Sequence, residues 1–166
     1  MGMIMSKKAM TRLLHAILCI GALIAAGIFF GAVPLYGQYM AQTAAPEFAY
    51  AYVPCLLWAW AFALPLFLAV IPAWRVVSSI SDARGAFCRA NVRALRQIAY
   101  LAFADGVIFP LGMLIVAFMG AGAPGLTVLV TPAVIFACAA AGIAALCLSC
   151  LVAEAAALRE ENDLTI

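Results

Sequence analysis

The chain has 166 residues, of which 69% are hydrophobic and only 10% are charged, and its formal net charge is +2. Soluble domains are typically about 45–50% apolar and about 25% charged, and one of this length has too little interior to hide so much apolar surface. The composition therefore excludes an ordinary soluble domain and predicts a single integral membrane domain, residues 1–166. So small a net charge gives no reason to expect direct nucleic-acid binding.

Four long apolar segments predict four transmembrane helices. Each is long enough, because crossing the hydrocarbon core takes about 20 helical residues, and an open strand edge would find no hydrogen-bond partner in lipid. The fold class that follows is an all-α integral membrane bundle in contact with the lipid bilayer. The predicted spans are about 13–33, 51–74, 97–119 and 126–152.

The first segment shares one feature with a secretory signal, since Lys7, Lys8 and Arg12 precede it. Its apolar stretch is longer than the usual 7–15 or so residues, and the small residues that follow run straight into Pro46, a poor place for cleavage. We interpret it as a retained membrane anchor.

The basic residues predict the orientation of the chain. All nine Lys and Arg residues lie before the first span, between spans two and three, or after the fourth, and the other two connections contain none. The positive-inside rule then places both termini, the loop 75–96 and the tail 153–166 in the cytoplasm.

The six cysteines predict neither a disulfide framework nor a metal site. Only Cys55 lies near the predicted outer face, so it has no partner there within the chain. Cys147 and Cys150 have CxxC spacing, but they lie inside a membrane helix without a second pair or a nearby histidine. We expect no cofactor.

Small residues mark the predicted helix contacts, because helices in lipid associate by close packing. The first span has Gly27 and Gly31 in GxxxG spacing, and the fourth has a small residue at every fourth position, including Ala137, Ala141 and Ala145. These series predict packing within the chain or, alternatively, a seam between copies in a homo-oligomer.

Asp105 is an ionisable residue well inside a predicted span, about 13 Å beyond Arg96 at helical rise. Burying an aspartate there costs about 2.5–3.5 kcal/mol, which makes it a candidate proton or substrate site. Two alternatives stay open. A protonated Asp105 could donate to a carbonyl near Gly21 or Gly142, since burial favours the neutral acid, or the residue could lie shallow and open to water.

The end of the loop 75–96 predicts an amphipathic helix that begins after Gly85 and runs into the third span. Such a helix suits a membrane interface, where its basic stripe meets anionic headgroups, or it forms a docking surface for the tail or for a soluble partner. At 100° per residue one stripe is basic and the opposite one is apolar with one asparagine. The basic stripe holds Arg89, Arg93 and Arg96, and the apolar stripe holds Phe87, Asn91, Leu95 and Ile98.

The chain ends in the acidic sequence EENDLTI. Carboxylates at a helix C-terminus are unfavourable unless cations compensate them, and the arginine stripe is predicted on the same side of the membrane. The tail could instead fray in water, or another protein could take it up as an extended peptide. Its residues are Glu160, Glu161, Asn162, Asp163, Leu164, Thr165 and Ile166.

The motif FCRANVRALRQIAY and the closing EENDLTI resemble the two signatures of a bacterial four-span membrane family catalogued as domain of unknown function 2975. The family usually has serine or threonine after the phenylalanine, where it would cap the helix, and this chain has Cys88. The resemblance implies an inner-membrane protein with no assigned reaction. It also implies a neighbouring gene for a small helix-turn-helix DNA-binding protein of the Cro/repressor type.

We expect no enzyme, because the chain has one histidine and no metal motif, phosphate loop or carboxylate dyad. Our leading hypothesis is a membrane partner that binds or sequesters the small DNA-binding regulator through a cytoplasmic surface. The Asn91 helix and the Glu161–Ile166 tail would form that surface. The alternatives are a small transporter or channel subunit that uses Asp105, and a structural subunit of a membrane complex.

Overall fold

The computed structural model describes residues 7–80, 88–122 and 124–163, and these are helical apart from short connections. The predicted site residues Phe87, Leu164, Thr165 and Ile166 lie outside the described residues. The elements in chain order are α1 (Lys7–Ala26), η1 (Gly27–Ala32), α2 (Val33–Tyr39), η2 (Met40–Ala44), η3 (Pro46–Ala51), α3 (Tyr52–Ser79), α4 (Arg89–Phe118) and α5 (Pro124–Asp163).

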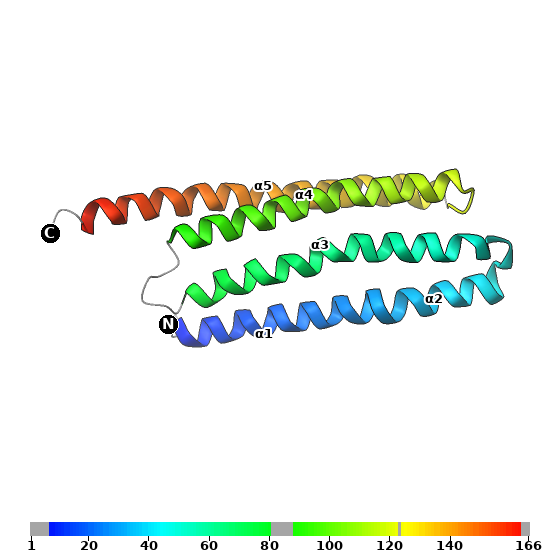
Figure 1. The fold of residues 1–166 in the computed structure, drawn as a ribbon, viewed down its shortest axis with the longest axis horizontal. Coiled ribbons are helices and arrows are strands. Elements are labelled where there is room, and N and C mark those ends of the chain that lie inside the picture. The colour runs from blue at the N-terminus through cyan, green and yellow to red at the C-terminus, as the bar shows by residue number, and fades with distance from the viewer. Residues whose placement is uncertain (1–6, 81–87, 123, 164–166) are drawn as a thin grey trace, which may run out of the picture.

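The elements form four antiparallel rods, and α1, η1, α2 and η2 together make up the first rod (Figure 1). The start of α1, the end of α3, the start of α4 and the end of α5 lie at one end of the molecule. The helix α4 packs most extensively against α5 and next against α3, whereas the first rod contacts mainly α3. The first rod is therefore the peripheral element.

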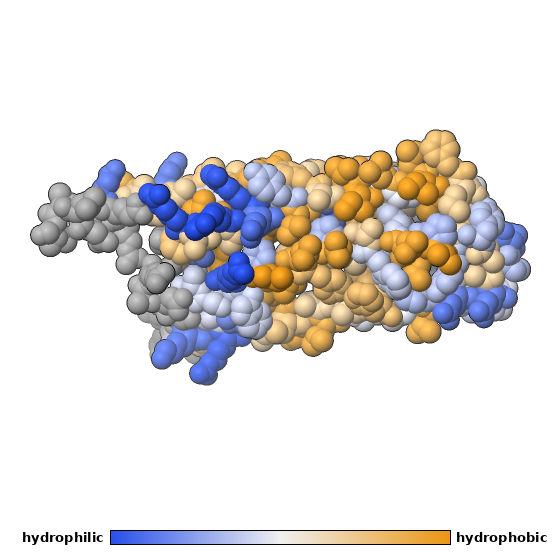
Figure 2. Space-filling model, in the orientation of Figure 1, coloured by the Kyte–Doolittle hydropathy of each residue, from blue (hydrophilic) through white to orange (hydrophobic). Residues whose placement is uncertain are grey.

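Among the described residues, four helices are long and apolar enough to cross a membrane, which confirms the predicted all-α four-span fold. Their limits are Lys8–Ala44, Pro46–Ser79, Arg89–Phe118 and Thr127–Leu158. Hydrophobic side chains form a broad band around the middle, and hydrophilic side chains gather toward the two ends (Figure 2). The helices are longer than the predicted spans, because further helical turns that are less apolar continue them beyond the apolar segments.

The start of α4 differs from the sequence prediction. Cys88 has an extended backbone (φ −136°, ψ 152°), so a helix that continues unbroken from Gly85 is wrong. The Cys88 carbonyl accepts hydrogen bonds from the Asn91 and Val92 amides, at 3.0 and 3.4 Å, and these begin the helix. No side chain caps it at Cys88, where a serine or threonine could do so.

The predicted tail is not a separate segment, because α5 continues as one helix through Asp163. At about 1.5 Å per residue its 40 residues span about 60 Å, twice the roughly 30 Å hydrocarbon core. The turn before it uses Gly120, whose φ of +71° suits a residue without a side chain.

The predicted small-residue series pack within the chain only in part. Ser149, which continues the every-fourth series, is fully buried and Ala153 packs against the apolar core, whereas the earlier positions are not buried. A Cβ added at Gly27 or Gly31 would meet nothing within 4 Å, and Ala137 and Ala141 are exposed while Ala145 is half-buried. The residues of α5 that approach α4 closely or are buried are Cys138, Gly142, Ser149, Val152 and Ala156. A four-residue step advances about 40° per repeat around a helix, so such a series drifts off the contact face. A seam between copies at these positions stays a prediction.

Candidate functional site

The described basic side chains lie at the end of the bundle where α1 begins and α5 ends, which we call the basic end, and hydrophilic residues gather there in Figure 2. The six described basic side chains there are exposed. They form a cationic rim around the helix ends, as the positive-inside pattern requires. These residues are Lys8, Arg12, Arg75, Arg89, Arg93 and Arg96.

Two adjacent serines at the end of α3 connect it to both of its neighbours. Ser79 Oγ donates to the Val76 carbonyl at 2.7 Å and accepts a 2.6 Å hydrogen bond from Asn91 Nδ2 of α4. Ser78 Oγ donates to the Trp74 carbonyl at 2.9 Å, so the 3.1 Å contact with His15 Nε2 of α1 has the histidine as donor. We call these four side chains, His15, Ser78, Ser79 and Asn91, the serine junction.

An apolar core lies beside the serine junction. It consists of Val92, Leu95 and Val152, with Val76 and Ala153 packed against it. The amphipathic pattern predicted for α4 is therefore present over its described residues. Its apolar stripe faces into the bundle and its basic stripe faces outward.

The two stripes of α4 do not form one surface. Asn91 is 3% exposed and Leu95 is 6% exposed, so both are buried between helices and do not lie on an open interaction surface. The arginines Arg89, Arg93 and Arg96 face outward. Of the predicted cytoplasmic surface, the basic stripe is accessible and the asparagine stripe holds the bundle together.

The α4–α5 register shows how far α5 extends. Phe103 packs against Gly142, and Gly106 against Cys138, with a Cβ added at Gly106 only 3.3 Å from the Cys138 Cβ. Continuing that antiparallel register at helical rise places Arg89 about level with residues 155–156. The helical residues 157–163 therefore continue about 10 Å past the start of α4, as the red end of α5 shows (Figure 1).

The acidic tail residues lie on or next to this extension. Glu161 is exposed on the extension, and Glu154 is exposed about level with the first turn of α4. Glu160, Asn162 and Asp163 belong to the last turns of α5. Pairing of the tail with the arginine stripe stays a prediction.

Asp105 lies in the middle of α4, away from the basic end. It is 7% exposed, and its Oδ1 atom is buried with no hydrogen-bond partner in the described part of the chain. The predicted shallow, water-open position is therefore wrong for this side chain. The neighbouring Gly106 brings α4 close to Cys138 of α5, and an unpartnered carboxyl oxygen in such a packed place is costly, about 1–3 kcal/mol.

Metal-binding geometry is absent from the residues that the structure describes, where no three His, Cys, Asp or Glu side chains gather. Cys147 and Cys150 are exposed on α5 and Cys138 is half-buried. This arrangement gives no closed tetrahedral thiolate set of the structural zinc kind.

Comparison with known proteins identifies the family. The family model described as "Protein of unknown function (DUF2975)" matches residues 35–166, which is most of the chain. The chain belongs to this family. It is also 32% identical over 136 residues to the "Uncharacterized membrane protein YoaS" of Bacillus subtilis (strain 168), covering 81% of this chain and 83% of the relative. No solved structure matches the chain.

Sequence reasoning missed the serine junction. The signal was present, because Ser78 and Ser79 are adjacent polar residues at the end of an apolar span and His15 stands at matching depth on the first span. Their partners could not be assigned from one sequence, since the rotation of α1 and α4 about α3 decides which serine faces which helix. Asn91 was predicted to matter, but as part of a surface.

Proposed function

We propose that this multi-pass membrane protein lies in the bacterial inner membrane with both termini cytoplasmic, and that its basic end binds or sequesters a small helix-turn-helix transcription regulator. The observation that carries the proposal is the extension of α5 about 10 Å beyond the start of α4. A helix end that extends beyond the start of the neighbouring helix is accessible to a soluble protein. The nine basic residues and their distribution support the cytoplasmic side.

The extension also presents apolar and charged side chains that a partner protein could recognise. Leu158 is 62% exposed on it, next to the acidic Glu161, while Arg89 and Arg93 face outward on the neighbouring helix. Exposed ion pairs contribute only about 0–1 kcal/mol each, so charge sets the orientation of a partner more than its affinity. The apolar side chain supplies the anchor, as in helix-in-groove recognition.

The test uses the full chain and a chain truncated after Ala156, expressed with the helix-turn-helix protein that the family resemblance places beside its gene. We expect the truncated chain to insert in the membrane as before and the regulator to move from the membrane fraction to the soluble fraction. Leu158→Asp should reproduce most of this loss, and Glu47→Lys, at the opposite end of the bundle, should not. Unchanged recruitment after truncation would disprove the proposal.

A second candidate function is supported by Asp105. A buried carboxyl with an unpartnered oxygen is the arrangement expected of a proton or substrate site inside a membrane. A small transporter or channel subunit would therefore use Asp105 as its polar group. The observation concerns a different part of the molecule, so the two functions can be tested separately.

Proton flux into proteoliposomes, followed with an enclosed pH-sensitive dye, tests this second candidate. If Asp105 carries protons, Asp105→Asn and Asp105→Leu both reduce the flux to that of empty liposomes. Thr131→Val is the matched control, because Thr131 Oγ1 is also buried without a partner among the described residues. Flux that does not exceed the empty-liposome value in the native chain removes this candidate.

A further inference from the structure

The structure contains a large cavity in the half of the bundle away from the basic end. Its volume is about 760 Å³, within the range of about 300–1,000 Å³ typical of small-molecule sites. The first rod, η3, α3 and α4 contribute its walls. It extends from Tyr52, at the start of α3, to Phe62, a distance of about 15 Å at helical rise.

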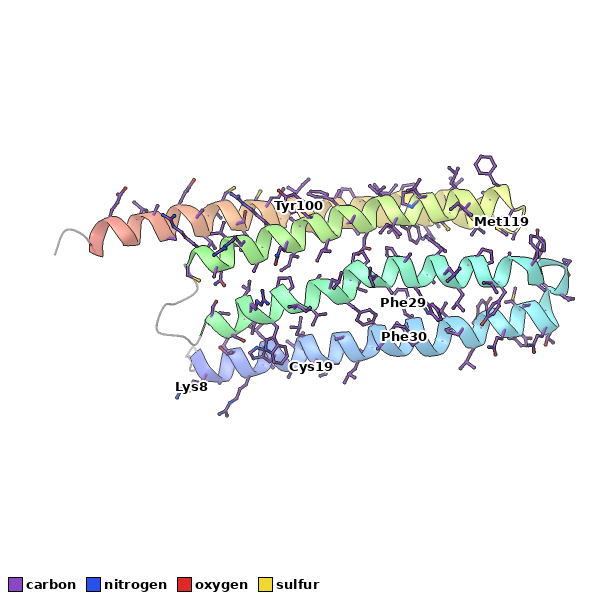
Figure 3. The ribbon with its side chains drawn as sticks, viewed as in Figure 1. Lys8, Cys19, Phe29, Phe30, Tyr100 and Met119 are labelled. Atoms are coloured by element: carbon purple, nitrogen blue, oxygen red, sulfur yellow. The ribbon has the colours of Figure 1, made fainter. Side chains whose placement is uncertain are left out.

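Aromatic side chains form the deep part of this cavity. Phe109 of α4 lies 5.4 Å from Trp58 and 5.3 Å from Phe62, centroid to centroid, and Phe62 lies 6.1 Å from Phe29 of the first rod. Figure 3 labels Phe29 on the first rod, and the Trp60 indole reaches the Phe29 carbonyl at 3.3 Å. Trp58 is held in place because its Nε1 donates to the Ile108 carbonyl at 3.3 Å.

The backbone of the first rod is irregular where it borders the cavity. Gly27–Ala32 and Met40–Ala44 are π-helical, and Phe29, Ala32, Met40 and Ala41 from these two segments line the space. Short π-helical segments, with i→i+5 hydrogen bonds, are rare and frequently occur at functional sites. Between them Gly37 leaves room for the Tyr52 ring, whose Cε2 would lie 2.8 Å from an added Cβ.

The chemistry of the lining selects a class of ligand. No charged side chain is among the described lining residues, so an ionised ligand would enter without compensation. The lining residues with polar side-chain hydrogens are Tyr36, Tyr52, Cys55 and Trp58, and the Trp58 Nε1–H already donates to the Ile108 carbonyl. Dividing the cavity volume by its length of about 15 Å gives a mean cross-section of about 50 Å². This cross-section is wide enough for an aromatic ring to enter edge-on, and it is larger than the cross-section of one extended hydrocarbon chain.

We propose that this cavity binds a neutral, ring-containing, membrane-soluble molecule, which stacks on the cluster of Phe29, Trp58, Phe62 and Phe109. Offset and edge-to-face contacts between rings supply affinity beyond simple burial. Such a molecule reaches the cavity through the bilayer. This binding site goes beyond the proposed function and does not depend on it.

The test measures quenching of Trp58 in the full chain in phosphatidylcholine nanodiscs. Trp60→Phe and Trp74→Phe leave Trp58 as the fluorophore, and 1-bromonaphthalene is the neutral ring probe, with a heavy atom that quenches on contact. We expect quenching that saturates at one probe per chain. Quenching that rises only linearly, as simple partition into lipid would give, overturns the proposal.

Two variants that fill the cavity and one control make the test specific. Ala59→Phe on α3 and Ala41→Phe on the first rod each place a ring in the space, and each should weaken saturable binding at least tenfold. Ala133→Phe, at an exposed position on α5, should leave it unchanged. If both filling variants keep the helical circular dichroism of the parent and also its probe affinity, the cavity is not the binding site.

A second arm separates a ring from a lipid tail. In nanodiscs made with brominated-acyl phosphatidylcholine, unbrominated naphthalene should relieve the quenching of Trp58 by displacing or excluding the chain. If naphthalene leaves that quenching unchanged, the occupant is an acyl chain and the proposal for a ring-containing ligand is wrong.

Discussion

The two halves of the molecule pack differently. At the basic end the buried hydrophobic residues include the large side chains of Val92, Leu95 and Val152. In the half that contains the cavity, the buried hydrophobic residues among those that the structure describes are the alanines Ala51 and Ala63. Such a difference is expected where one end of a bundle meets water and the other half lies in lipid, because water drives apolar side chains together, whereas lipid is as apolar as they are and rewards only close packing.

From this contrast we expect a rigid region and an adaptable one. The basic end combines an apolar core with the serine junction, so its helices are fixed relative to one another. The cavity half is held by single close contacts such as Trp58 against Gly112 and by hydrogen bonds to backbone carbonyls. A platform for a protein partner suits the first region, and a site that takes up a small molecule suits the second.

The largest expected effect comes from removing the core at the basic end. Leu95→Ala should lower the free energy of unfolding by about 2–5 kcal/mol, because it leaves a cavity in a packed site. SDS-induced unfolding in mixed micelles, followed by circular dichroism, measures the change. Leu129→Ala, at a leucine that is 74% exposed, is the control and should change it by less than about 0.5 kcal/mol. Equal losses would mean that the basic end has no distinct core.

A next, smaller effect is expected at the closest contact of the cavity half. A Cβ at Gly112 would overlap the Trp58 indole, so Gly112→Ala should cost about 1–3 kcal/mol by overpacking and weaken the Trp58–Ile108 hydrogen bond. The measurements are SDS unfolding and a shift of the tryptophan emission. Gly21→Ala meets nothing within 4 Å and should be neutral or stabilising by up to about 1 kcal/mol. If Gly112→Ala leaves the free energy of unfolding unchanged, the helices of this half must shift to accommodate the added methyl group.

The serine junction is expected to contribute a comparable or smaller amount. Asn91→Ala and Ser79→Ala each remove one partner of a buried 2.6 Å hydrogen bond, at a cost of about 1–3 kcal/mol. In a double-mutant cycle the two losses should be less than additive by at least about 0.5 kcal/mol, since both break the same contact. Strict additivity would show that Asn91 and Ser79 act independently.

The sequence predicted the fold class because bilayer thickness and apolar composition leave few choices. The four spans were predicted from apolar runs, and the amphipathic character of α4 from its helical periodicity, and each of these patterns lies within a single helix. The helix start at Arg89 was missed, since the extended Cys88 depends on how the chain leaves α3. The predicted span 126–152 is shorter than α5 because the polar residues after 152 continue the helix outside the apolar window.

The sites were less predictable than the spans, since they depend on rotation and register between helices. Asp105 could be identified from its own position, and the structure adds that its Oδ1 atom is unpartnered. The cavity could not be identified, because its walls come from distant parts of the chain and its π-helical segments have no clear sequence signal. The cavity is built mainly by helices.

The smallest expected effect lies at the rim of the cavity half. Tyr50 of η3 donates its hydroxyl to the Met119 carbonyl at 2.6 Å, which ties the connection before α3 to the end of α4. Tyr50 is 56% exposed, so water can replace the lost partner and Tyr50→Phe should cost about 0.5–1.5 kcal/mol in SDS unfolding. Tyr39→Phe, at a tyrosine that is 57% exposed on α2, is the matched control. A loss as large as that of Leu95→Ala would place a second rigid region at this end, and the contrast between an adaptable and a fixed half would no longer hold.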